Sequence, residues 1–166
     1  MERLMFEEQL LANIPDSFQD MEPDKIGLMY PYEERPQIIL EDKETDRVCT
    51  FSLLERQELP EGQIECAVYE MMEVVRSLYP SSILEKPQFT ESRCCGWFSY
   101  KMANVEGELY QRMYILRVSG CMMLGTMGCR MDDEAGKEQM TEILMSLKDL
   151  KKRTFFRKLN WGGKMQ

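Results

Sequence analysis

Residues 90–130 are rich in strand-forming patterns, and this run constrains the fold more than any other part of the sequence. The strand-like pieces are Arg93–Met102, Leu109–Val118 and Cys121–Arg130, and short turns separate them. In the last piece every second residue from 121 to 129 shares one face, because side chains alternate along a strand. The middle piece is apolar on both faces at its centre, which is typical of a strand covered on both sides. The run therefore predicts an antiparallel meander.

Two amphipathic segments lie before and after this meander. Residues 64–79 carry apolar side chains at helical spacing, and Pro80 ends the predicted helix. Asp132 and Asp133 can cap a second helix. Its apolar stripe consists of Met140, Ile143, Leu144, Leu147 and Leu150. Both helices need a sheet face to cover.

The N-terminal third is expected to add further strands. Leu4–Ile14 is interpreted as a strand that leads into a loop, and Asp20–Lys25 as one helical turn with Pro23 near its start. Gln37–Glu41 and Val48–Leu54 predict a hairpin around a polar loop. The order of elements predicts an α+β chain, an α/β/α sandwich with a central antiparallel sheet flanked by two long amphipathic helices.

The charge of the chain is unevenly distributed. The 166 residues carry a net charge of −8, but residues 148–166 carry +6 and the remaining 147 residues carry −14. An acidic body would repel phosphate over most of its surface, so contact with nucleic acid or a membrane is expected only through the C-terminal tail. We therefore expect a single domain over residues 1–150 and a basic-aromatic tail over residues 151–166.

The tail holds the candidate contact residues of this sequence. They are Lys151, Lys152, Arg153, Phe155, Phe156, Arg157, Lys158 and Trp161. The cations could meet an anionic surface or a protein partner, while the aromatic rings enter the interface or stack on bases. Alternatively, the cations follow a helix whose dipole favours them, and the tail folds onto the acidic body.

Motifs for catalysis and for cofactor or metal binding are not found in the sequence, so no catalytic, cofactor-binding or metal-binding residue is assigned. The chain has no histidine, the commonest general base and a frequent metal ligand. It also lacks a phosphate loop, a dinucleotide fingerprint and a nucleophile elbow. The six cysteines form no C-x-x-C pair, and they are expected to be reduced and structural. Cys94 and Cys95 could alternatively form a redox-sensitive pair.

The sequence predicts a cytoplasmic protein. No apolar run approaches the roughly 18 residues that suggest a membrane span. The first eight residues lack the basic-then-apolar pattern of a secretory signal.

Three short aromatic and proline signatures resemble a known family. They are Ile14-Pro15-x-x-Phe18, then Tyr30-Pro31 with Arg35-Pro36-Gln37-Ile38-Ile39-Leu40, and finally Gly96-Trp97-Phe98. Together with the order of elements, these residues are similar to small bacterial proteins of the Mog/PsbP-like superfamily, over about residues 4–150. The resemblance implies an α/β/α sandwich and a mostly non-catalytic, accessory role. The histidines associated with metal binding in the photosystem branch of that superfamily have no counterpart here.

These observations favour a non-enzymatic accessory module that binds a protein partner, with no cofactor implied. Two alternatives stay open. One is an enzyme that uses carboxylates or a cysteine in a pocket, which a strongly perturbed carboxylate in a concave site would favour. The other is a structural homo-oligomer. The sequence does not specify the partner or the oligomeric state.

Overall fold

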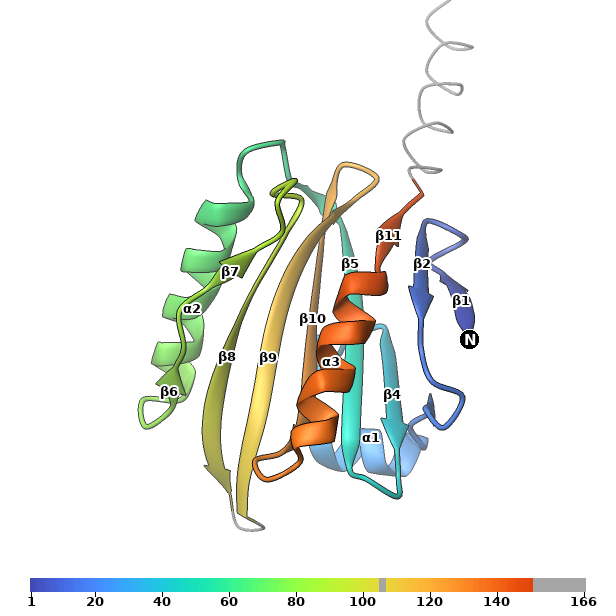
Figure 1. Ribbon diagram of the computed structural model, residues 1–166, viewed down its shortest axis with the longest axis vertical. Coiled ribbons are helices and arrows are strands. Elements are labelled where there is room, and N and C mark those ends of the chain that lie inside the picture. Colours follow the sequence, from blue (N-terminus) through green and yellow to red (C-terminus); the bar gives the residue numbers. More distant parts are fainter. Residues whose placement is uncertain (105–106, 151–166) are drawn as a thin grey trace, which may run out of the picture.

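An antiparallel sheet of eight strands dominates the computed structural model, which describes residues 1–104 and 107–150 (Figure 1). Its strands are hydrogen-bonded in the order β3-β4-β5-β10-β9-β8-β6, and β7 also pairs with β8. The bounds are Gln19–Asp20 for β3, Ile38–Asp42 for β4, Arg47–Glu58 for β5, Ile83–Leu84 for β6, Gln88–Phe89 for β7, Cys95–Asn104 for β8, Gly107–Val118 for β9 and Cys121–Arg130 for β10.

The predicted meander and hairpin are confirmed in this sheet. β8, β9 and β10 pair consecutively, and β4 pairs with β5 across the polar loop at residues 43–46. The alternating apolar pattern of these segments suits strands that bury at least one face. The mainly antiparallel sheet therefore follows from the period-2 patterns in the sequence.

Three helices accompany the sheet: α1 (Pro23–Met29), α2 (Ile64–Leu78) and α3 (Glu134–Ser146). The α2 side chains share a buried cluster with Phe98, Ile115 and Met122, whereas α3 shares another with Tyr114 and Met123. Because Tyr114 and Ile115 are neighbours on β9, they point to opposite faces of the sheet. Figure 1 shows α3 lying over one of these faces. No described helix is both long and apolar enough to cross a membrane.

The second amphipathic helix is shorter than predicted. We expected it to continue through Leu150, but α3 ends at Ser146 and residues Lys148–Asp149 form strand β11. This strand pairs with β2 (Leu10–Asn13), and the Asp149 carboxylate accepts a hydrogen bond from the Ser119 backbone at 3.0 Å. Pairing with an available strand edge therefore overrides the helical spacing of Leu147 and Leu150.

The prediction of a single strand over Leu4–Ile14 is wrong, because the segment spans the turn between the two strands of a hairpin. β1 (Glu2–Met5) pairs with β2, and β11 completes a three-stranded sheet. The turn covers residues 6–9, and its first three residues, Phe6, Glu7 and Glu8, have positive φ of 54° to 66°. Such left-handed backbone usually marks glycine or asparagine, so these residue types gave no turn signal. The single helical turn predicted at residues 20–25 is also wrong in its bounds, because the helix there, α1, runs from Pro23 to Met29.

One tyrosine bridges two strands through a gap left by a glycine. Tyr114 on β9 is fully buried, and its hydroxyl donates to the Thr50 carbonyl of β5 at 2.9 Å. The ring reaches β5 across Gly125 on the intervening strand β10: a Cβ atom there would lie 2.2 Å from the Tyr114 hydroxyl. The missing side chain at Gly125 is therefore what allows this buried hydrogen bond.

A partly buried ion pair holds α3 against the sheet. Two nitrogens of the Arg47 guanidinium donate to the two carboxylate oxygens of Asp133, at 2.7 and 2.9 Å. Asp133 also caps α3, as predicted from the sequence, by accepting from the Gly136 backbone at 2.9 Å. One carboxylate thus satisfies both a helix end and a cation on β5.

Candidate functional site

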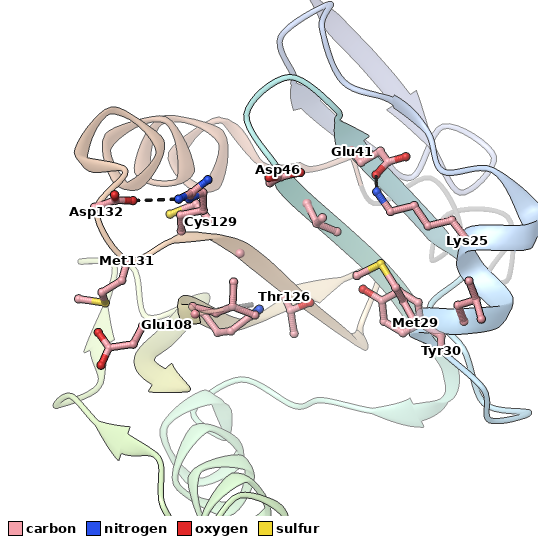
Figure 2. Close-up of a pocket in the computed structure, with 17 residues that line it drawn as sticks. Lys25, Met29, Tyr30, Glu41, Asp46, Glu108, Thr126, Cys129, Met131 and Asp132 are labelled. Atoms are coloured by element: carbon pink, nitrogen blue, oxygen red, sulfur yellow. Dashed lines mark hydrogen bonds and ion pairs between the residues drawn. The ribbon is translucent and has the colours of Figure 1, made fainter. Parts of the chain in front are cut away.

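The candidate site is an open cavity of about 1310 Å³ beside α1, which we call the α1 groove (Figure 2). Its floor is formed by the ends of β5, β9 and β10, on the face of the sheet that α2 also covers. The lining residues used below are Lys25, Leu28, Met29, Tyr30, Glu41, Asp46, Glu108, Gln111, Gly128, Cys129, Arg130 and Asp132. Because α2 packs over the other part of this face, the groove occupies the part that α2 leaves uncovered.

The floor of the groove is flat at one point because Gly128 lacks a side chain. A Cβ atom at Gly128 would lie 2.7 Å from the amide nitrogen of Gln111, which is the neighbouring residue on β9. The Gln111 side chain therefore lies along the sheet surface. Its amide supplies hydrogen-bonding atoms to the floor of the groove.

The carboxylate of Glu41 is buried at the end of the groove near α1. Lys25 on α1 donates to Glu41 Oε2 at 2.5 Å, and the Glu41 side chain is only 2% exposed. The other oxygen, Oε1, is buried and has no hydrogen-bond partner among the described residues. Figure 2 shows the Lys25 side chain extending from α1 to this carboxylate. A buried carboxylate oxygen without a hydrogen-bond donor is unfavourable in free energy, and a ligand that donates to it would relieve this penalty.

The outer rim of the groove is acidic. Asp46, Glu108 and Asp132 are exposed, and Arg130 lies 3.7 Å from Asp132. Within residues 1–104 and 107–150, Asp46 and Glu108 take part in no ion pair. After Lys25–Glu41 and Arg130–Asp132 are paired, the groove therefore keeps two negative charges. Such a rim attracts cationic groups.

Apolar side chains of α1 lie along the opposite rim. Leu28 is 83% exposed and Met29 is 44% exposed, although both residues are apolar. Burial raises the pKa of the adjacent Tyr30, so its phenol stays neutral. The groove thus combines an apolar side with an acidic side, which suits a ligand that has both apolar and basic groups.

Three buried thiols of the chain, of which Cys129 borders the groove, are poor nucleophiles. Burial raises the pKa of Cys129, which borders the groove, to about 11. Burial also raises the pKa of Cys49 and of Cys95 to about 12. All six cysteines are free, as expected, and these three are protonated at neutral pH. The described residues also include no group of three carboxylate or thiol side chains arranged to hold a metal ion.

Comparison with solved structures identifies the fold. The crystal structure of the Ran-binding protein Mog1p from Saccharomyces cerevisiae matches with a TM-score of 0.62 at 8% identity, over 93% of this chain and 97% of that one. A point mutant of Mog1 matches with a TM-score of 0.63 at 9% identity, over 93% and 98% of the two chains. The solution structure of cyanobacterial PsbP from Synechocystis matches with a TM-score of 0.62 at 10% identity, over 90% and 91%.

This chain has the Mog1/PsbP fold. The resemblance that its aromatic and proline signatures indicated is thereby confirmed at the level of fold. No protein-family model matches the sequence. No curated protein matches it either.

The sequence alone predicted contact residues in the C-terminal tail and did not single out the α1 groove. The eight tail residues that it selected, from Lys151 to Trp161, lie outside the described residues. It indicated Asp46 only as part of a hairpin loop and Asp132 only as a cap. The loop position of Asp46 is confirmed, whereas Asp133 and not Asp132 caps α3, and the Asp132 carboxylate lies 3.7 Å from Arg130. Neither interpretation could reveal that Asp46 and Asp132 share a rim with Glu108.

Proposed function

We propose that this chain is a non-enzymatic accessory module that binds a protein partner in the α1 groove. The proposal rests on one open cavity that combines exposed Leu28 and Met29 with two acids, Asp46 and Glu108. These acids form no ion pair in the part of the chain that the structure describes. Exposed apolar side chains beside uncompensated charge are typical of interaction surfaces. The partner segment is therefore apolar and basic.

The comparisons support a protein partner in general terms, because one matching structure is described as a Ran-binding protein. We place the module in residues 1–150 and in the cytoplasm, and we treat residues 151–166 as a second contact. The enzyme alternative is less well supported: a cysteine nucleophile needs a thiolate, and burial holds the Cys129 thiol protonated at neutral pH. The carboxylate Glu41 is already engaged by Lys25.

A pair of substitutions on the acidic rim tests the proposal. We expect the full chain with Asp46→Asn and Glu108→Lys to bind its partner about tenfold more weakly, because favourable charge is lost and one repulsive charge is gained. Asparagine is chosen at position 46 because φ is 57° there, a conformation that asparagine tolerates. The measurement is affinity capture from native lysate at low and high salt, with captured proteins quantified by mass spectrometry.

The matched control is Glu65→Gln with Glu70→Lys. Both residues are exposed on α2, away from the groove, and the change in net charge is the same. A specific partner should be retained by the control and lost by the groove variant. Equal retention by the two variants would remove the α1 groove as the binding surface.

A further inference from the structure

We infer that the α1 groove receives the segment Lys151–Trp161 of a second copy of this chain. The inference rests on the proposed function of the groove and names one occupant. The segment carries five cations between residues 151 and 158, together with Phe155, Phe156 and Trp161. Its cations complement the acidic rim of the groove, and its aromatic rings complement the apolar α1 side.

Charge complementarity favours this occupant. The first 147 residues carry −14, and residues 148–166 carry +6. Asp46 and Glu108 offer two carboxylates that form no ion pair within the described residues. Opposite charges of this size steer the two surfaces together and fix their orientation.

The apolar contacts are also matched. Leu28 and Met29 expose their side chains on the α1 side of the groove, so aromatic rings placed there would remove apolar surface from water. Aromatic anchors next to a polar rim are the usual composition of strong contact points in interfaces. Phe155 and Phe156 lie between the basic clusters Lys151–Arg153 and Arg157–Lys158, which allows the rings and the cations to bind together.

Phe155 and Phe156 of the same copy cannot reach the acidic rim of the groove. The Asp149 carboxylate contacts the backbone of Ser119, so the described chain ends beside the β9–β10 turn, on the α3 face of the sheet. The acidic rim at Glu108 lies eleven residues further along β9, a distance of about 36 Å. Phe156 is six residues beyond Leu150 and can reach at most about 22 Å even when fully extended. The groove is also on the other face of the sheet.

A tail bound in trans produces a head-to-tail contact. Each copy offers one tail and one groove, and binding of its tail leaves its own groove open. Such a heterologous contact propagates into longer assemblies or closes into a ring. Self-association should therefore depend on concentration and weaken as salt screens the charges.

Complementation between two full-length variants tests the inference. The groove variant carries Asp46→Asn and Glu108→Lys, and the tail variant carries Phe155→Ser, Phe156→Ser and Trp161→Ser. In sedimentation velocity, we expect the unmodified chain to self-associate and each variant alone to associate at least tenfold more weakly. An equimolar mixture of the two variants should form a one-to-one complex and nothing larger, because only one intact junction is possible. The Glu65→Gln, Glu70→Lys control should behave like the unmodified chain.

Three results would overturn the inference. An unmodified chain that stays monomeric up to its solubility limit would show that the tail does not bind in trans. Variants that associate as strongly as the unmodified chain would place the contact on another surface. A mixture that forms no complex, although each variant is monomeric, would show that the two sites do not bind each other. The proposed function has its own contradicting result. It is contradicted if the groove variant captures the protein partner as well as the tail variant does.

Discussion

Replacing Gly125 with alanine is expected to lower the free energy of unfolding by about 3 kcal/mol or more. The new Cβ atom would lie 2.2 Å from the Tyr114 hydroxyl and 2.3 Å from the Thr50 carbonyl oxygen. The second neighbour is backbone of a central strand, so it cannot move aside without disturbing β5. Tyr114 cannot move easily either, because it is fully buried and its ring contacts Phe51 edge-on, with the centroids 6.2 Å apart.

Urea unfolding followed by circular dichroism measures this effect. Gly27→Ala is a suitable control, because a Cβ atom at Gly27 would meet nothing within 4 Å and the residue lies inside α1. We expect that control to be neutral or to gain up to about 1 kcal/mol through helix propensity. If Gly125→Ala unfolded within about 1 kcal/mol of the unmodified chain, the close approach of Tyr114 would not be a feature of the native state.

Replacing Asp133 with alanine is the second change with a large expected effect, a loss of about 3 kcal/mol. The Arg47 and Asp133 side chains are only 14% and 18% exposed, so removal of the carboxylate leaves a poorly solvated guanidinium. The same change removes the cap on Gly136. Asp133→Asn should cost less, because an amide oxygen can still cap α3. Thermal unfolding of both variants at neutral pH separates the two contributions.

The same pair predicts a dependence on pH. The Arg47 guanidinium, by hydrogen bonding to Asp133, lowers the pKa of that carboxyl below its ordinary value. The ionised Asp133 carboxylate contributes its full stabilisation above the pKa of about 3.9 that it has in the unfolded chain. This stabilisation is lost as pH falls through the lower pKa that Asp133 has in the folded chain. The gap in unfolding free energy between the unmodified chain and Asp133→Asn should therefore narrow in that acidic window. A gap that stays constant down to about pH 2 would contradict this account.

Periodic segments made most of the fold predictable. The α2 helix follows its predicted bounds to within one residue because its apolar stripe and Pro80 define both its face and its end. The β8–β10 meander was predictable because alternation persists over whole strands. Strong periodic patterns of this kind reflect burial, so they report directly on the sheet and the helices that cover it.

Features that depend on distant residues were not predictable. Strand β11 exists because Lys148 and Asp149 meet the edge of β2, and nothing in their own pattern indicates a strand. The α1 groove joins Lys25, Asp46 and Glu108, which lie in three segments far apart in sequence. Each of these residues is an ordinary exposed charge in its local pattern. Their role arises from the register of the sheet, which a single sequence does not reveal.

The pairing of β11 with β2 has a consequence for how the chain folds. Ser146 accepts a hydrogen bond from the Asn13 backbone across a separation of 133 residues, and Leu10 pairs with Asp149. Closing so long a loop costs entropy before any contact is gained, which slows folding. During synthesis the edge of β2 must remain unpaired until almost all of the sheet-forming residues have emerged. The N-terminal hairpin, although made first, is therefore expected to acquire its final partner last.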